Sequence, residues 1–307
     1  LVEWVTTHIK LSNWKTGEVV YENDVEHPAN WAQSAVEMCA SKYLRRADIP
    51  NIGGERSIKQ LAARVANDLA QHGKKRGYFT SEEAKIFRDE IIAGFITQRI
   101  GFNSPVWFNF GLYNEYGIEG TKGRDRFFVN PDTNEIEKLD RELIRPGGAA
   151  CFLTKVTDSL FSDDGDGMYE WLATQTMVFL TGAGDGANVS NIRGVGEPIS
   201  GGGISAGLPA FLPVRDQASG YIKSGGKTRR SATMLVCDLD HPDIEWYINW
   251  KRHEEAKAHA LIAMGYEADY EGEAYGTVSG QNSNNSVRVS NAFMETFHTG
   301  GNWHLLS

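Results

Sequence analysis

The pattern of apolar and polar positions along the chain changes near residue 149. Before that point, residues 1–26 alternate around a turn close to Gly17, which predicts short strands. Helical patterns follow over residues 28–46, 55–72 and 80–99. The third begins with Thr80-Ser-Glu-Glu83, a capping-box sequence, and its apolar side chains recur at helical spacing. We therefore predict a mostly helical N-terminal region over residues 1–145.

Two segments of this region depart from the helical pattern. Residues 101–109 are rich in aromatic and other apolar side chains, and they predict a loop that is unusually apolar for a surface connection. Residues 113–147 are polar and rich in Gly, Asp and Asn, which favours a hairpin or an insertion.

Strand and helix patterns alternate after this point. Strands are predicted at residues 150–156, 232–239 and 286–290, and helices at residues 159–180, 208–223, 242–264 and 291–298. Such alternation is typical of an α/β sheet or barrel. The predicted fold class is therefore α/β, with a second domain over residues 146–307.

Composition narrows the classes of function. The chain has 307 residues, of which 41% are hydrophobic, and a formal net charge of −9. This charge argues against a nucleic-acid polymer or an anionic membrane as partner. We expect a cytoplasmic protein, because the sequence has only three cysteines, no signal peptide and no apolar run of transmembrane length. Because the chain lacks an initiator Met and stops soon after a helical pattern, we expect a piece of a longer protein.

Two glycine clusters flank an apolar helical stretch. The first is Ser200-Gly-Gly-Gly203, and the second, Ser224-Gly-Gly-Lys-Thr-Arg-Arg230, is also cationic. Glycine lets backbone approach a ligand closely, and Lys and Arg suit phosphate oxygens, so these clusters predict a nucleotide-handling loop. A P-loop is excluded because Tyr221 stands where that motif requires glycine. The alternative is a solvated basic turn.

Two further features have alternative interpretations. Gly182-Ala-Gly-Asp-Gly186 follows a predicted helix and lacks the spacing of a dinucleotide-binding fingerprint. It is consistent with a tight turn or with backbone packed against a ligand. Cys151 lies in an apolar strand, and its surroundings alone favour a buried, inert thiol.

Acidic residues and a histidine gather where a strand runs into a helix, at Asp238, Asp240, His241 and Asp243. They could hold a metal ion. The start of a helix at Pro242 explains them better, because Pro suits the first helical turn and acids suit its positive end. We predict no metal site.

Eight segments occur in an order and spacing that match one family. They are residues 102–109, 150–152, 158–160, 182–188, 200–203, 222–230, 240–244 and 284–289. Each motif is weak alone, whereas the eight together are specific. Over nearly its whole length the chain resembles the large subunit of ribonucleotide reductase, in its class II, adenosylcobalamin-dependent type.

The resemblance implies a fold and a reaction. The helical region over residues 1–145 would lead into the first half of a ten-stranded α/β barrel over residues 146–307. Adenosylcobalamin would generate a thiyl radical on a cysteine at the barrel centre, the radical would take the ribose 3′ hydrogen, and the 2′-hydroxyl would leave as water. A cysteine pair would supply electrons and become a disulfide. The implied partners are a ribonucleoside diphosphate substrate, a deoxynucleoside triphosphate effector and a thioredoxin-type reductant, and a homodimer is allowed.

The resemblance also implies site residues. Cys151 matches a reducing cysteine, which overrides the inert-thiol interpretation, and Ser104, Ala150 and Gly184 match positions that face the substrate. Residues 194–203 match a first effector loop. The residues that match the specificity-effector site are Asp158, Ser159, Arg193, Lys223, Ser224, Gly225, Gly226, Lys227, Thr228, Arg229 and Arg230.

Alternative functions stay open at this point. By the resemblance, the radical-bearing cysteine and the second reducing cysteine should lie beyond Ser307, so the chain alone is expected to be inactive. It could instead act alone as a regulatory module that binds deoxynucleoside triphosphates without catalysis. Further alternatives are a class I-type large subunit with a metal-based radical partner, and a glycine-rich α/β barrel enzyme of another kind.

Overall fold

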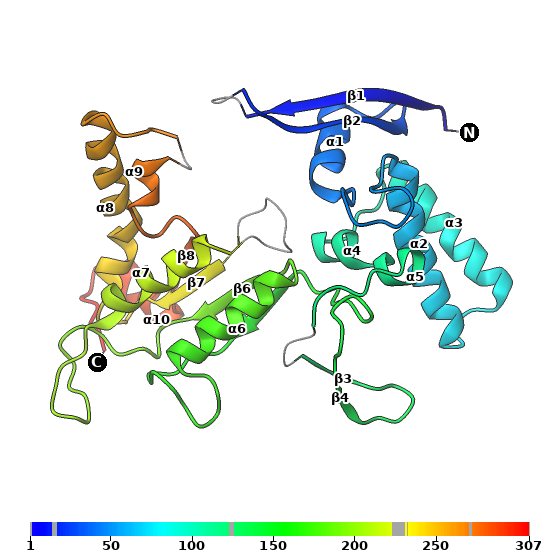
Figure 1. The fold of residues 1–307 in the computed structure, drawn as a ribbon. Helices are drawn as coiled ribbons and strands as arrows, with labels where there is room; N and C mark the ends of the chain where they lie inside the picture. Colours follow the sequence, from blue (N-terminus) through cyan, green and yellow to red (C-terminus); the bar gives the residue numbers. More distant parts are fainter. Residues whose placement is uncertain are drawn as a thin grey trace. The chain divides into compact units, whose positions relative to one another are not determined.

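The computed structural model describes residues 2–13, 17–122, 126–222, 231, 233–269 and 272–306. The chain forms two compact units, Leu1–Ala150 and Cys151–Ser307. Figure 1 shows the elements of both units, which are described separately below.

The first unit opens with the predicted strands. β1 (Trp4–Ser12) and β2 (Val19–Pro28) pair antiparallel, with Trp4 opposite Pro28. Helix α1 (Gln33–Met38) continues into one π-helical turn, η1 (Cys39–Tyr43), and α2 (Ile58–Lys75) and α3 (Ser81–Ile96) follow. The first helix begins later than predicted because Pro28 still belongs to β2. The core of the unit includes Ile9, Val25, Val36, Leu61 and Val65, all buried.

The starts of α2 and α3 follow from local sequence. Thr80 accepts a hydrogen bond from the Glu83 backbone N–H, and the Glu83 carboxylate accepts one from the Thr80 N–H, so the predicted capping box is confirmed. Ser57 and Gln60 form the same reciprocal arrangement at α2. Each box satisfies backbone donors that the first helical turn leaves unpaired.

The predicted aromatic loop over residues 101–109 was wrong. Residues from Ser104 onward form a short helix, α4 (Ser104–Asn109), with Asn103 as N-cap. Its aromatic side chains are buried, and the Trp107 ring lies 4.3 Å from that of Phe95 between centroids. The apolar composition that looked odd for a loop is therefore that of a core helix. A second short helix, α5 (Leu112–Tyr116), follows.

The hairpin predicted within residues 113–147 is present. β3 (Phe127–Val129) pairs antiparallel with β4 (Ile136–Lys138). The turn between them contains Asn134 with φ 59°, a backbone conformation that Asn adopts more readily than most residues.

The second unit is built on one parallel sheet. Its strands are β5 (Cys151–Thr154), β6 (Gly184–Asn188), β7 (Thr233–Asp238) and β8 (Ser283–Arg288), hydrogen-bonded in that order. The helices are α6 (Met168–Leu180), α7 (Gly207–Gly220), α8 (Ile244–Ala263), α9 (Glu273–Gly276) and α10 (Asn291–Thr299). The alternation of strand and helix predicted for this part is confirmed, and the unit is α/β.

Helices α6, α7 and α8 cover one face of this sheet. Ala187 and Leu235 are register partners on that face, and both belong to a buried core that also contains Trp171, Leu208 and Tyr247 of the helices. The next row of the sheet points the opposite way, because side chains alternate along a strand. That row includes Leu153, which is 94% exposed, and Met234, which is 47% exposed. Among the described residues, no helix covers this second face of the sheet, which is called the uncovered face below.

Two details predicted for the second unit were wrong. The tight turn that was one alternative for residues 182–186 does not extend over them, because Gly184 starts β6, which lies between β5 and β7. Glycine is a poor strand former, but a strand hydrogen-bonded on both sides gains enough pairing to override that preference. Helix α6 starts at Met168 rather than residue 159, because the Glu170 carboxylate caps the backbone N–H of Gly167.

Candidate functional site

The cysteine on the first strand of the sheet lies beside a glycine. Cys151 and Gly184 are register partners at the starts of β5 and β6. Both lie on the uncovered face of the sheet, because they precede Leu153 and Gly186 by two residues and side chains alternate along a strand. Cys151 is exposed, whereas Gly184 is buried. Gly184 has no side chain, so the thiol lies next to bare backbone.

The other two cysteines lie in different surroundings. Cys237 is fully buried on the helix-covered face of β7, and burial raises the pKa of its thiol to about 12. Burial also raises the pKa of Cys39, at the start of η1, to about 11. Both thiols therefore stay protonated at neutral pH, and the inert interpretation suits them.

This contrast predicts selective thiol chemistry. At pH 8, a soluble disulfide reagent should modify Cys151 rapidly, because the thiolate is the reactive form and Cys151 is accessible. Cys39 and Cys237 should react at least about a hundredfold more slowly, and faster as the pH rises toward 11 and 12. Timed quenching and peptide mass spectrometry measure the order, and a Cys151→Ala control should lose the fast phase. A fast reaction at Cys237 would contradict this description of the sheet.

Two of the residues matched to the effector site are in contact. The Arg193 guanidinium donates to the Asp158 carboxylate, and the Arg193 backbone N–H donates to the same carboxylate at 3.2 Å. Arg193 Nη1 also donates to the Pro198 carbonyl at 2.8 Å. The acid and the base predicted for this site thus lie together in the second unit, half-buried.

The segment that carries Asp158 and Ser159 is held by Asp166. Lys155 Nζ lies 2.6 Å from one Asp166 oxygen, and the Ser162 hydroxyl donates to the other at 2.6 Å. These partners, Lys155 first, lower the pKa of Asp166 to about 2, so the carboxylate is charged throughout the neutral range. The backbone N–H of Met168 bonds to the Ser159 carbonyl at 2.8 Å, which ties the segment to the start of α6.

The stretch matched to the first effector loop forms a small hairpin. Pro198 and Ile204 form an antiparallel bridge, and the Gly196 N–H bonds to the Ser205 carbonyl at 2.9 Å. Gly202 turns the chain with φ 84°, which favours glycine. The glycine cluster at residues 201–203 thus supplies the tip of a hairpin.

The acidic cluster after β7 anchors this hairpin. The Asp243 carboxylate accepts hydrogen bonds from the backbone N–H groups of Val195, at 3.0 Å, and Leu208, at 2.9 Å. His241 Nε2 lies 2.7 Å from the Ile192 carbonyl oxygen. The sequence positions of Asp243 and His241 indicate only the start of a helix, not that these side chains hold both ends of a loop. Both side chains are buried, and the sequence pattern does not show that an acid is buried.

Other predicted site residues fall elsewhere. Ser104 and Ala150 belong to the first unit, where the Ser104 hydroxyl lies 3.2 Å from that of Tyr43. Ala150 directly precedes Cys151 in the chain. The predicted effector residues Lys223, Ser224, Gly225, Gly226, Lys227, Thr228, Arg229 and Arg230 lie outside the described residues.

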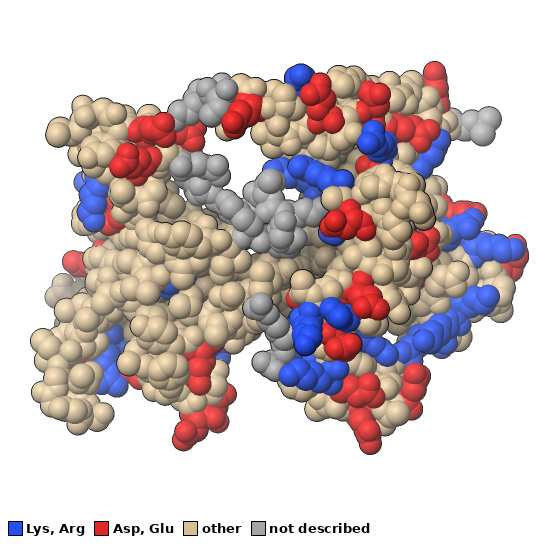
Figure 2. Space-filling view, viewed as in Figure 1, with Lys and Arg blue, Asp and Glu red and all other residues tan. Residues whose placement is uncertain are grey.

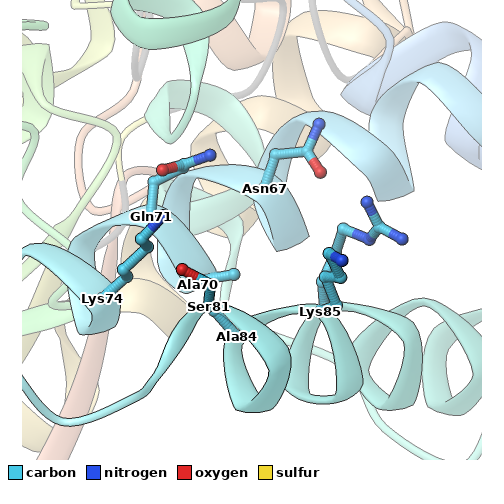
Figure 3. A pocket seen from close by; sticks show the side chains of 8 residues that line it. Asn67, Ala70, Gln71, Lys74, Ser81, Ala84 and Lys85 are labelled. Atoms are coloured by element: carbon cyan, nitrogen blue, oxygen red, sulfur yellow. The ribbon is translucent and has the colours of Figure 1, made fainter.

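A groove of about 240 Å³ lies between α2 and α3 and contains none of the predicted site residues. Figure 3 shows the side chains that reach it from both helices. Figure 2 shows Lys and Arg side chains gathered over these helices. Two of the cations that line the groove are paired, Lys85 with Glu82 at 3.4 Å and Arg88 with Asp89 at 2.7 Å. We therefore assign no ligand to it.

In the ranges given above, no three His, Cys, Asp or Glu side chains gather as metal ligands. Within the same ranges, none of the helices combines the length and the apolar composition needed to cross a membrane.

Known proteins resemble this chain over both units. Residues 149–307 match the family model described as "Ribonucleotide reductase, barrel domain", and residues 6–98 match "Class II vitamin B12-dependent ribonucleotide reductase".

Three relatives named "Vitamin B12-dependent ribonucleotide reductase" are similar. The one from Agrobacterium fabrum is 33% identical over 94% of this chain and 30% of its own length. The one from Rhodopirellula baltica is 37% identical over 94% of this chain and 27% of its own length. The one from Streptomyces avermitilis is 36% identical over 100% of this chain and 28% of its own length. The chain thus spans less than a third of these relatives.

Proposed function

The chain belongs to the class II vitamin B12-dependent ribonucleotide reductase family, and from this premise we propose that the full-length protein reduces ribonucleoside diphosphates to deoxyribonucleotides. The observation that carries the proposal is Cys151 beside Gly184 on the uncovered face of the sheet. A thiol in this position can meet a ribose, and the glycine lets that ribose approach the backbone.

The sheet is proposed as the first half of a ten-stranded barrel, formed within residues 146–307. Its four strands are parallel and follow the chain order without reversal. A doubly wound sheet reverses its strand order and has helices on both faces. In the described part of this chain, the helices pack against one face of the sheet. Parallel sheets rarely leave a face in water, so closure into a barrel would cover the row that contains Leu153 and Met234.

Cys151 is proposed as one of two reducing thiols. In the overall step, two thiols lose two electrons and two protons as they form a disulfide, while the ribose loses its 2′-hydroxyl as water and gains a hydrogen at that carbon. Cys237 does not suit the second role, since its side chain is buried on the helix-covered face. The disulfide must then be reduced before another turnover, which requires an external thioredoxin-type reductant.

Adenosylcobalamin is the proposed cofactor, because the relatives are named for vitamin B12. When bound, it would supply the radical that starts a thiyl-radical mechanism. The groove between α2 and α3 has a volume of about 240 Å³, which is too small to enclose a corrin cofactor. We assign the cofactor no residue of this chain.

Asp158, Ser159 and Arg193 are proposed to bind a deoxynucleoside triphosphate effector, together with residues 223–230. A carboxylate accepts hydrogen bonds from sugar hydroxyls, and a guanidinium binds phosphate. Their contact with the 196–205 hairpin supports this assignment, because a bound effector would touch a loop as well as a helix start. A homodimer is the proposed assembly.

An activity assay of the full-length protein tests the proposal. Ribonucleoside diphosphates should yield deoxyribonucleoside diphosphates only when adenosylcobalamin and a dithiol reductant are both present, with product identified by chromatography and mass spectrometry. The matched triphosphates should react more slowly. If no deoxyribonucleotide forms at saturating concentrations of substrate, adenosylcobalamin and reductant, the proposed function is refuted. Faster reduction of the triphosphates would refute only the diphosphate assignment.

A further inference from the structure

A chain of buried polar side chains runs beneath the sheet on its helix-covered side. Its members are Gln175, Asp185, Arg215, Ser219, Ser231 and Thr233, each at most 6% exposed. They come from α6, β6, α7 and β7 and from the position just before β7. Buried polar groups are costly unless they bond to one another, so such a network specifies one arrangement of the elements that contribute to it.

Gln175 is the centre of the network. Its Nε2 donates to Asp185 Oδ2 at 2.9 Å and to the Thr233 hydroxyl at 3.2 Å. Its Oε1 lies 3.2 Å from the Ser219 hydroxyl, whose single proton is shared with the Arg215 carbonyl at 3.0 Å. Rotating the amide by half a turn would place its oxygen against the Asp185 carboxylate, so the orientation of Gln175 is fixed. One side chain thus links α6 to two strands and to the end of α7.

The network also joins two chain positions that bracket residues 220–230. The Ser231 hydroxyl donates to the Ser219 carbonyl at 2.6 Å. The Ser219 hydroxyl bonds in turn to Gln175. Ser219 and Ser231 are therefore held together, and Ser219 is also bonded to Gln175, which in turn bonds to Asp185 of β6.

Arg215 adds a buried charge to this arrangement. Its Nη2 donates to Thr233, and its guanidinium lies over the Trp171 ring, 4.9 Å from the centroid. Among the described residues, its Nε and Nη1 have no hydrogen-bond partner. A buried cation with unfilled donors is sensitive to small shifts of its neighbours, because the surrounding interior screens charge poorly.

The strand end of the network lies next to the proposed substrate site. Asp185 stands between Gly184 and Gly186, and its side chain points to the helices while those glycines belong to the uncovered face. A displacement of Asp185 would therefore move the backbone that flanks Cys151. The network connects this backbone with Ser219 and Ser231, which flank the predicted effector residues 223–230 in the sequence.

We infer that Gln175 and Ser219 are positioning residues that transmit the identity of a bound effector to the choice of substrate. This inference rests on the proposed function. Neither side chain needs to touch a nucleotide. Gln175 links Ser219, at the end of α7, to the strand that contains Gly184, and the Ser219 backbone carbonyl is bonded to Ser231. A shift of Ser219 or Ser231 would therefore be felt at that strand.

The test compares substrate selectivity in the full-length protein. Two ribonucleoside diphosphates compete in one reaction, with each deoxynucleoside triphosphate effector in turn and without effector. For Gln175→Met and, separately, Ser219→Ala, the effector-dependent change in product ratio should fall by about three- to thirtyfold. The effector-free rate and the effector Kd, measured by calorimetry, should stay within about twofold of wild type. Two variants are used because either one alone could fail to fold.

Thr176→Val is the matched control. Thr176 neighbours Gln175 on α6, and its hydroxyl donates to the Leu172 carbonyl of the same helix at 2.9 Å. It should retain wild-type selectivity. Two outcomes would overturn the inference without affecting the proposed function. One is wild-type selectivity in both folded test variants. The other is a loss of the effector-free rate as large as the loss of selectivity. If the wild-type enzyme itself shows no effector-dependent selectivity, the effector proposal fails and this inference fails with it.

Discussion

Replacing Cys151 by serine in the full-length protein is expected to abolish multiple turnover supported by a thioredoxin-type reductant, with kcat reduced by at least about a thousandfold. Serine nearly matches cysteine in size and would occupy the same exposed position beside Gly184. A hydroxyl cannot form a disulfide, however, so it cannot surrender the electron pair that the reaction consumes. The expected loss is therefore one of chemistry and not of binding.

Separate measurements distinguish these two effects. The Kd for a ribonucleoside diphosphate should change by no more than a few-fold in Cys151→Ser, because the side chain keeps its shape. Cys39→Ala serves as the control, since that thiol lies in the first unit and burial raises its pKa to about 11. It should retain activity within about twofold, because this thiol lies outside the proposed site and alanine removes only one sulfur atom. Multiple turnovers by Cys151→Ser would show that this thiol is not a reductant.

Features governed by local sequence could be predicted. The capping box of Thr80 and Glu83 involves residues three positions apart, so its chemistry is visible in the sequence alone. The β1–β2 pairing and the alternation of strands with α7 and α8 follow from hydrophobic period and turn residues. The position of Cys151 on the first strand of the sheet was also predicted from its apolar surroundings.

Features that depend on distant partners could not. Strand β6 contains Gly184, Asp185 and Gly186, a composition that normally indicates a turn, and it becomes a strand only because β5 and β7 hydrogen-bond to its two edges. The role of Asp243 depends on the backbone N–H groups of Val195 and Leu208, which are far away in the sequence.

The candidate site shows the same division. Sequence motifs selected Asp158 and Arg193, and the structure brings the two side chains together. The buried network around Gln175 carries no motif, since a lone glutamine on a predicted helix resembles a surface residue until its burial is known. Residues expected to contact a ligand can thus be predicted from motifs more readily than the buried residues that hold them in place.

The largest expected effect on stability concerns a buried ion pair in the first unit. Arg64 Nε lies 2.8 Å from Glu55 Oε1, and the two side chains are 1% and 0% exposed. Arg64 also donates to the carbonyls of Trp107, at 3.0 Å, and Phe110. Glu55 accepts from the Tyr116 hydroxyl at 3.0 Å and from the Arg45 backbone N–H at 2.7 Å. The pair thereby joins α2 to α4, to α5 and to the segment before α2.

Replacing Arg64 by methionine should lower the free energy of unfolding of this unit by about 3–5 kcal/mol. Methionine fills much of the same volume, but it leaves the Glu55 carboxylate buried without its cation and two carbonyls without donors. Native-state hydrogen exchange of the α2 amides measures the change within this unit, independently of the second one. Adding Glu55→Gln to Arg64→Met should recover part of the loss, because the uncompensated charge is then removed.

The control for this prediction is the exposed pair of Lys85 and Glu82, whose side chains are 64% and 76% exposed at a separation of 3.4 Å. Water screens that pair, so Lys85→Met should change stability by no more than about 0.5 kcal/mol. If Arg64→Met were equally mild, the guanidinium could not be the group that balances the Glu55 charge. The helices of this unit would then have to be held by apolar contacts such as Trp107 against Phe95, whose ring centroids lie 4.3 Å apart.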